Sequence, residues 1–232
     1  MELLKRLKSK STSLKRAKDF RLVIFDLDHT LISVASSYHY VKTLYRKGIL
    51  SLRQILQAVF IRWKFFLTSM SLEDLHHLVF EKMLKGFSLD DLEAHVEELI
   101  RELLPMAIYE PAFRELKIAQ KQGDYIVLLS SAPDFLVRAF ASYFEIEHWE
   151  CTVYAVDKRK RLCDIANLMV GSKKMQSFVK LRTQLGISKE QTVVYSDSYD
   201  DLPLFLQAGQ PIAVNPDRKL AKIARKLHWR VI

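Results

Sequence analysis

The chain has 232 residues, of which 49% are hydrophobic and 27% are charged. This balance excludes a disordered, collagen-like or low-complexity chain, and the length suffices for one sizeable core with an insertion or for two small domains. Two cysteines, Cys151 and Cys163, are too few for a disulfide scaffold, so we expect reduced thiols. No apolar run reaches the length of a membrane span and no signal-peptide pattern begins the chain, which predicts a cytoplasmic protein.

The net charge of +9 is unevenly distributed along the chain. Residues 1–19 hold seven basic residues against two acidic ones, and residues 32–72 hold six basic residues and no acidic one. This asymmetry predicts that one face meets an anionic partner, either a membrane surface or a nucleic acid. Residues 1–19 are interpreted as a basic N-terminal tail, which is either a plain tail or a weak electrostatic anchor to anionic lipid.

In chain order, the first predicted element is a buried strand at residues 21–26, a short apolar run that ends in Asp26. The pattern is then helical as far as residue 110, with Ser71 and Ser88 as predicted N-caps and with helices at residues 38–47, 52–67, 72–84 and 89–103. Beyond it, strands at residues 125–130, 192–197 and 211–215 alternate with helices at residues 112–122, 134–144, 174–185 and 218–227. The alternation predicts an α/β fold with a parallel sheet and a helical insertion after the first strand.

One predicted helix is unusually apolar and basic. Between residues 49 and 67 the apolar side chains recur at helical spacing and cover more than one side of the helix, while Arg53 and Lys64 lie among them. Such a helix either packs between its neighbours or lies in a membrane interface, and both interpretations stay open here. Peripheral contact with an anionic membrane through residues 1–19 and 49–67 is therefore one expectation.

The residues that carry chemistry follow predicted strands, and ligands of open parallel sheets bind beyond the carboxyl ends of the strands. Asp26 and Asp28 follow the first strand, and two carboxylates so close together do not both ionise comfortably without a cation. One carboxylate of such a pair can serve as a nucleophile that forms an acyl phosphate, and the other as a general acid. Asp197 and Asp201, at the end of a later strand, offer the hard oxygen ligands that suit Mg²⁺.

Transfer of a phosphoryl group also needs donors and cations for the phosphoryl oxygens. Ser130, at the end of the second predicted strand, offers a hydroxyl group, and Lys174 offers a fixed positive charge just inside a helix. Both assignments have an alternative, because Lys173 competes with Lys174 and because Ser130 and Ser131 precede Pro133, where they can be simple helix caps.

Four ordered motifs of the chain resemble those of the haloacid dehalogenase-like hydrolases, in the branch that includes phosphoserine phosphatase. The first and the fourth are the specific ones, Asp26-Leu-Asp28-His-Thr30 and Ser196-Asp-Ser-Tyr-Asp-Asp-Leu-Pro203. The second and third motifs, a serine at a strand end and a lysine, are best matched by Ser130 and Lys174.

This resemblance implies a Rossmann-like catalytic core of residues 20–34 and 111–232, with an inserted all-helical cap of residues 35–110. It implies that Asp26 is the nucleophile and Asp28 the general acid/base. Mg²⁺ is the implied cofactor, and its implied ligands are Asp26, the carbonyl group of Asp28, Asp197 and, in support, Asp201. The implied phosphate-binding residues are Thr30, Ser130, Ser131 and Lys174.

Two departures from the branch bear on the substrate. Phosphoserine phosphatases carry a glutamate for the substrate amine nine residues after the nucleophile, where this chain has Ala35. The usual glycine of the fourth motif is Ser196, which is similar to the motif of phosphatidylglycerophosphate phosphatases. Phosphoserine is therefore a poor candidate, and a phospholipid head-group phosphate gains support.

Together the residues and the resemblance predict a Mg²⁺-dependent phosphatase that hydrolyses a phosphate monoester through an aspartyl-phosphate. The substrate is either a phospholipid head group, such as phosphatidylglycerophosphate, or a small soluble metabolite. The alternative from another class is a catalytically idle protein that binds anionic lipid or nucleic acid on the same fold. We expect no specific nucleic acid, because no recognised nucleic-acid motif is present.

Overall fold

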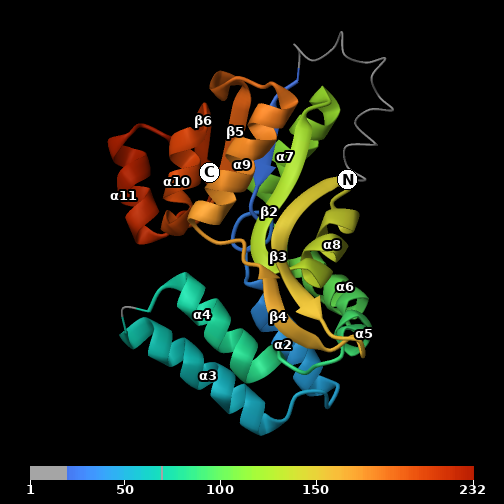
Figure 1. Cartoon of the computed structure of the whole chain (residues 1–232). Helices are drawn as coiled ribbons and strands as arrows, with labels where there is room; N and C mark the ends of the chain where they lie inside the picture. Colours follow the sequence, from blue (N-terminus) through green and yellow to red (C-terminus); the bar gives the residue numbers. More distant parts are fainter. Residues whose placement is uncertain (1–19, 69) are drawn as a thin grey trace.

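A computed structural model describes residues 20–68 and 70–232, so the predicted basic tail, residues 1–19, lies outside the described residues. The described chain builds one sheet with the strand order β4-β3-β2-β1-β5-β6-β7 (Figure 1). Its strands are β1 (Leu22–Phe25), β2 (Tyr125–Pro133), β3 (His148–Val156), β4 (Leu162–Asn167), β5 (Thr192–Ser196), β6 (Gln210–Ala213) and β7 (Arg230–Val231). Neighbouring strands run parallel except β3 and β4, which are antiparallel. The predicted α/β fold with a parallel sheet is confirmed.

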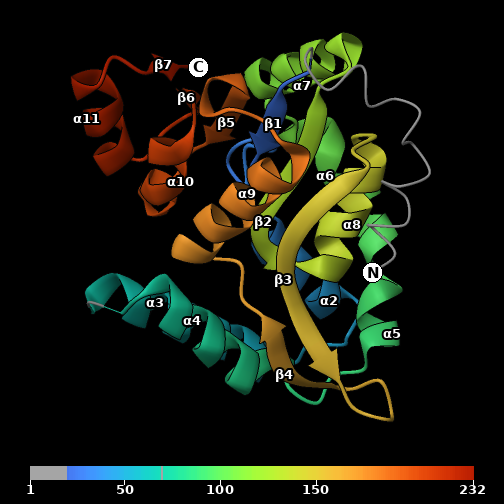
Figure 2. The same cartoon turned by 45° about the horizontal axis from the view of Figure 1, so that its top comes forward.

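The central strand β1 is buried on both faces, which explains its uninterrupted apolar sequence. Val23 and Phe25 face one hydrophobic core, and Leu22 and Ile24 face the other, because successive side chains of a strand point to opposite sides. Helices therefore cover both faces of the sheet (Figure 2). One core receives α7 (Glu110–Gln122) and α8 (Asp134–Tyr143), and the other receives α9 (Ser172–Leu185), α10 (Leu202–Gln207) and α11 (Arg218–Lys226).

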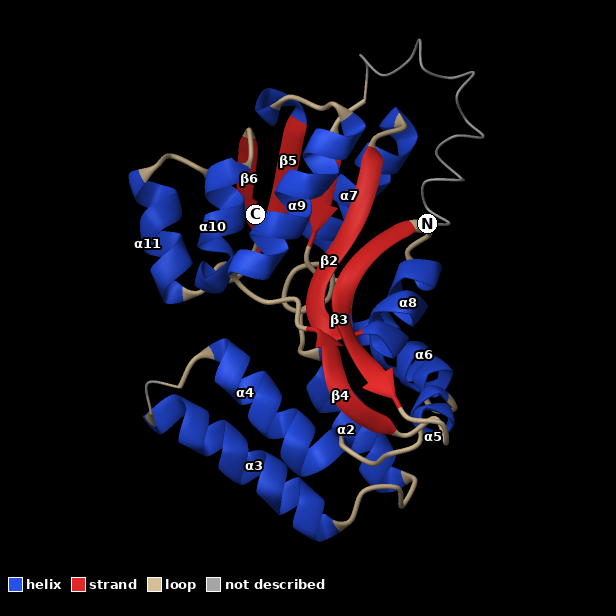
Figure 3. Ribbon diagram, in the orientation of Figure 1, coloured by secondary structure: helices blue, strands red, loops and turns tan. Residues whose placement is uncertain are grey.

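The segment between β1 and α7 forms helices only, among its described residues. They are α2 (Ser36–Arg46), α3 (Leu52–Leu67), α4 (Leu72–Val79), the π-helical turn η2 (Phe80–Leu84), α5 (Leu89–Glu93) and α6 (Val96–Ala107). In Figure 3, α2, α3 and α4 lie below the carboxyl ends of the central strands, whereas α5 and α6 lie to the right, next to α8. No helix of residues 20–68 and 70–232 combines the length and the apolar composition needed to cross a membrane.

Two predicted N-caps of the inserted helices are confirmed, and one predicted helix is wrong. Ser71 and Ser88 are N-caps, since their hydroxyl groups accept hydrogen bonds from the backbone N–H groups three residues later. The single helix predicted at residues 89–103 is two helices, α5 and α6, and α6 continues through Pro105 to Ala107. Pro105 lies in the last turn, where it removes only one backbone hydrogen bond and does not end the helix.

Strands β3 and β4 form a hairpin that the sequence analysis missed, and this hairpin reaches the inserted helices. At its turn, Gly86 N donates to Leu162 O over 2.8 Å, and Leu162 N donates to Phe87 O over 2.9 Å. Higher on the hairpin, the ring of Tyr154 stacks on Phe80 with centroids 5.2 Å apart. The hairpin is therefore a direct attachment between the sheet and the insertion.

The insertion is attached to the sheet a second time where the chain enters and leaves it. Ser33 N donates to Ala107 O over 2.7 Å, and Tyr109 N donates to Leu31 O over 2.9 Å. These hydrogen bonds pair the two connecting segments like a short antiparallel ladder.

Candidate active site

The turn that follows β1 fixes the position of Asp26. Asp26 N donates to Tyr195 O over 3.0 Å, which extends the β1–β5 pairing by one residue, and Leu27 N donates to Asp26 Oδ1 over 2.8 Å. His29 adopts a left-handed backbone conformation with φ of 57°, which is uncommon for a residue with a side chain. The turn therefore places the Asp26 carboxylate at the carboxyl edge of the sheet, held by its own backbone.

Asp28 is held by the first inserted helix. Ser36 N, at the beginning of α2, donates to Asp28 Oδ1 over 2.9 Å. Burial raises the pKa of Asp28 above its ordinary value, and the hydrogen bonds from Ser36 limit the rise. A carboxyl group in this environment can retain a proton and release it to a leaving group.

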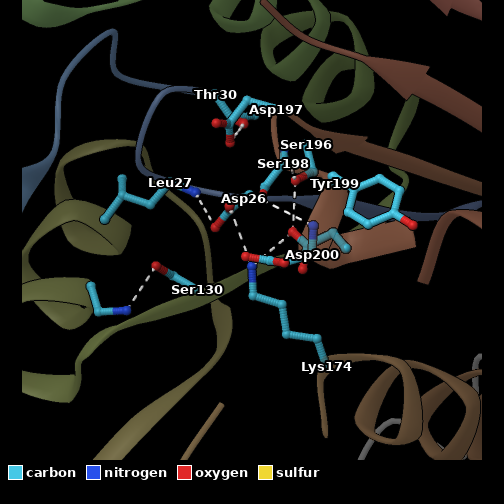
Figure 4. A network of polar contacts seen from close by, with 12 residues as sticks. Asp26, Leu27, Thr30, Ser130, Lys174, Ser196, Asp197, Ser198, Tyr199 and Asp200 are labelled. Atoms are coloured by element: carbon cyan, nitrogen blue, oxygen red, sulfur yellow. Dashed lines mark hydrogen bonds and ion pairs between the residues drawn. The ribbon is translucent and has the colours of Figure 1, made fainter. Parts of the chain in front are cut away.

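Lys174 joins two of these acids in a buried ion pair. It lies in the first turn of α9 and is 4% exposed, whereas Lys173 is exposed. Its Nζ lies 2.9 Å from Asp201 Oδ2 and 3.3 Å from Asp26 Oδ2 (Figure 4). Burial alone would lower the pKa of Lys174, but the two carboxylates raise it above its ordinary value. The structure thus brings Lys174, and not Lys173, to Asp26.

The loop after β5 carries Asp197 and Asp201 to the same edge. Ser196 Oγ donates to Asp201 Oδ2 over 2.6 Å, so this oxygen is shared by Ser196 and Lys174. Thr30 Oγ1 donates to Asp197 Oδ1 over 3.3 Å, which ties the β1 loop to the β5 loop (Figure 4). The hydroxyl group of Thr30, predicted to bind phosphate, is used here to orient a carboxylate.

Ser130 lies one strand away from Asp26. Because Phe25 pairs with Leu128, Ser130 stands one residue beyond the position opposite Asp26. Its side chain is buried, and its Oγ accepts a hydrogen bond from Ala132 N over 3.2 Å, which leaves the hydroxyl proton available as a donor. Helix α8 has Pro133 as its N-cap with no side-chain cap, so neither Ser130 nor Ser131 caps it.

The electrostatics of the carboxylates suit a cation. Burial raises the pKa of Asp26 to about 7 and that of Asp197 to about 8, and the charge of Asp26 adds to the rise at Asp197. Two hard oxygen donors that repel each other when ionised fit Mg²⁺, which commonly binds through one or two carboxylates and retains waters. In the described part of the chain, no cluster of three or more acidic, histidine or cysteine side chains could hold a metal ion without further ligands. Asp26 and Asp197 are thus the fitting pair, while Asp201 is held by Lys174 and Ser196.

Two residues near this site were not singled out in the sequence. Asp217 accepts a hydrogen bond from Tyr199 N over 2.6 Å, and its own N–H donates to Asp197 O, so it supports the loop that carries Asp197. Burial lowers the pKa of His76 of α4 to about 4, and the charges of His77 and Lys174 add to the shift. Asp217 has a detectable signature as the N-cap of α11, but nothing in the sequence around His76 marks it.

A family model described as haloacid dehalogenase-like hydrolase matches residues 23–206. The chain belongs to the haloacid dehalogenase-like hydrolases. The family predicted from the four motifs is therefore confirmed, and residues 23–206 include all four of them.

Relatives of this hydrolase include proteins named as phosphatases. A probable phosphatase of Mycobacterium tuberculosis is 26% identical over 212 residues, which cover 90% of this chain and 73% of that protein. Histidinol-phosphatase of Neisseria meningitidis is 28% identical over 219 residues, which cover 91% of this chain and 97% of that protein. A substrate-bound phosphoserine phosphatase has the same fold, with a TM-score of 0.64 at 17% identity over 88% of this chain and 90% of that one.

Proposed function

We propose that this hydrolase removes the phosphoryl group from a small phosphate monoester by way of an aspartyl-phosphate on Asp26. The observation that carries the proposal is the contact of Lys174 Nζ with Asp26 Oδ2, 3.3 Å apart in a buried site. A buried ammonium group beside a carboxylate favours the ionised form that acts as a nucleophile, and it attracts an anionic phosphoryl group to it. Relatives named as phosphatases support the same reaction class.

The residues divide the reaction into two displacements. Asp26 attacks the phosphorus atom, and the leaving oxygen takes a proton from Asp28, whose raised pKa favours the protonated form. Asp28, now a carboxylate, removes a proton from the water that attacks the aspartyl-phosphate, so that Asp26 is regenerated and inorganic phosphate leaves. Lys174 and the hydroxyl group of Ser130 hold the phosphoryl oxygens during both steps.

Mg²⁺ is the proposed cofactor, with Asp26, Asp197 and the carbonyl oxygen of Asp28 as its proposed protein ligands. When bound, the ion supplies positive charge for the phosphoryl oxygens and favours the ionised forms of both carboxylates. Asp201 is proposed to act through Lys174, because its Oδ2 accepts hydrogen bonds from Lys174 and Ser196.

The substrate proposal is a small soluble phosphate ester whose recognition does not depend on an amine at the position of Ala35. A methyl group at residue 35 offers no counter-charge to an ammonium group, which argues against phosphoserine. Histidinol-phosphatase among the relatives supports a water-soluble ester. The phospholipid head-group alternative has one structural observation in its favour, the exposed apolar face of α3.

The test is a phosphate-release screen with the full chain, Mg²⁺ and a panel of soluble phosphate esters together with phosphatidylglycerophosphate. Asp26→Asn keeps the shape of the side chain but removes the nucleophile, so we expect turnover to fall by at least about 10³-fold. EDTA is expected to abolish the wild-type activity, and added Mg²⁺ to restore it.

The matched control is Asp200→Asn, which changes an exposed acid of the same loop and is expected to leave turnover near the wild-type level. Wild-type activity in Asp26→Asn would contradict the mechanism. Absence of Mg²⁺-dependent phosphate release from every ester would instead favour the catalytically idle binding protein.

A further inference from the structure

Helix α3 carries a row of exposed apolar side chains along one face. Phe60 is 58% exposed and Trp63 is 60% exposed, and their rings lie 6.3 Å apart between centroids. The row follows the i, i+4, i+7, i+8, i+11, i+15 spacing of a single helical face, within an arc of about 100°. Its members, called the outer face of α3 from here on, are Leu52, Leu56, Val59, Phe60, Trp63 and Leu67, each at least 58% exposed.

The opposite side of α3 is the side that packs on the protein. Ile61, on that side, is 4% exposed, and Ile55 packs against the main hydrophobic core. In Figures 1 and 3 α4 lies between α3 and the sheet, so that α3 is the outermost of the inserted helices. Its N-terminus is fixed by a capping box between Ser51 and Gln54. The outer face therefore belongs to a helix whose opposite side is packed on the protein, so its exposure does not result from a detached helix.

Basic side chains border the outer face. Arg53 and Lys64 are exposed at its margin, and neither forms an ion pair with a described residue. The whole stretch from residue 32 to residue 72 contains no acidic side chain. An exposed apolar face with aromatic rings and a basic border matches a helix that lies in the plane of an anionic membrane interface. We propose that the outer face of α3 docks this protein on an anionic membrane surface.

The charge of α3 distinguishes a membrane from the other occupants that an apolar face can have. In a second copy packed face to face, Arg53 and Lys64 would meet the same basic residues, because a two-fold interface brings identical surfaces together. Residues 1–19 of the chain, with seven basic residues against two acidic ones, also carry the wrong charge to cover it. Anionic lipid head groups complement the basic border while the acyl chains accept the apolar side chains.

The docking surface does not depend on the proposed reaction, since none of its residues contacts the carboxylates or Lys174. Its position nevertheless has a meaning for the reaction. In Figure 3, α3 and α4 lie on the side of the sheet where the central strands have their carboxyl ends. A membrane under α3 would thus lie on the side of the molecule where the inserted helices approach the site.

The experiment is flotation of the full chain with vesicles of phosphatidylcholine, with and without phosphatidylglycerol. We expect binding to the anionic vesicles that weakens as salt increases, and a blue shift of tryptophan emission that is lost in Trp63→Phe. The double variant Phe60→Ser/Trp63→Ser removes apolar contacts and keeps every charge. Its vesicle affinity is expected to fall by about tenfold per residue or more.

The matched control is Met106→Ser/Leu206→Ser, which removes two exposed apolar side chains from α6 and α10 and should bind vesicles like the wild type. Release of phosphate from a soluble ester and the circular dichroism spectrum report whether each variant is folded. The proposal is overturned if the wild-type chain does not bind anionic vesicles, or if the folded Phe60→Ser/Trp63→Ser variant binds them like the wild type. A dimer in sedimentation that dissociates in this variant would assign the outer face to a second copy instead.

Discussion

Lys174 is the residue whose surroundings define the site. Its ammonium group is buried between Asp26 and Asp201, and removal of one partner from a buried ion pair leaves the other charge without compensation. Lys173, its neighbour in sequence, points to solvent. Two adjacent lysines thus offer a comparison in which only position differs.

We expect Lys174→Met to lower kcat/KM by about 10²-fold or more, because the phosphoryl oxygens lose a buried cation and the pKa of Asp26 rises further. Lys173→Met should leave kcat/KM unchanged. Steady-state kinetics on the best ester of the screen measures both. Equal losses in the two variants would show that position 174 has no special role.

The Lys174→Met variant is also expected to lose stability, since Asp201 becomes an unpaired buried acid. Lys174→Met/Asp201→Asn restores neutrality and should recover much of the unfolding free energy without recovering activity. Urea unfolding followed by circular dichroism separates this structural effect from the kinetic one.

At the residue scale, the sequence predicted which side chains converge but not how they are paired. Asp26, Asp197 and Lys174 were predicted because each follows a recognisable strand or opens a helix. The hydrogen bond from Thr30 to Asp197 joins residues 167 positions apart, and no local pattern encodes it. The sequence also showed Ser196 in place of the usual glycine, but its hydrogen bond to Asp201 is visible only in the structure.

Helix α9 is the element that presents Lys174, and its two ends are both glycines. Gly171, at the N-cap, has φ of 48° and ψ of −117°, a combination that is essentially restricted to glycine. Gly186, at the other end, has φ of 66° and ψ of 27°, the ordinary left-handed cap. Only the first of these turns sets the direction from which Lys174 enters the site.

We expect Gly171→Ala to lower kcat/KM by about tenfold or more, because the backbone must leave its present conformation and α9 shifts with Lys174. Gly186→Ala should cost about 1 kcal/mol of stability and leave the activity of the folded protein unchanged. Both sites have open space for a methyl group, so conformation alone is tested. Steady-state kinetics and urea unfolding of the two variants measure these effects. Unchanged kinetics in folded Gly171→Ala would refute the role of Gly171 in positioning Lys174.

At the element scale, periodicity predicted the helices and the central strands far better than the strands at the edges of the sheet. Residues 52–67 were predicted as a helix with the bounds that α3 has, because apolar side chains recur at helical spacing along this stretch. Hairpin β3–β4 was missed because most of its residues are exposed or half-buried, so no apolar run marks it. Its stability comes from strand pairing and from contacts with the insertion, which a local window does not contain.

His76 of α4 couples protonation to the folded state of the whole molecule. Burial lowers its pKa to about 4, with smaller contributions from the charges of His77 and Lys174. Because the ordinary value is 6.5, the unfolded chain binds a proton in the window between pH 6.5 and 4 that the folded protein does not. Proton binding to His76 in the unfolded chain therefore lowers the free energy of unfolding as the pH falls through that window.

We expect the stability lost between about pH 7 and pH 5 to be larger in the wild type than in His76→Gln, by up to about 2 kcal/mol. The comparison with the variant is needed because Asp26 and Asp197, whose pKa values are raised, contribute with the opposite sign. Urea unfolding at both pH values gives the difference. Identical pH dependence in the two proteins would show that His76 is equally accessible to protons in both states.

The hydrogen bonds of the β3–β4 turn to residues 86 and 87 have a consequence for how a substrate enters. A domain that is joined to its neighbour only through two connecting strands can rotate about them as a unit. Here a third point of attachment, far along the chain from the other two, opposes such a rotation. Rotation of the whole insertion as a unit is then disfavoured, so that an ester is expected to enter through a smaller shift within the insertion.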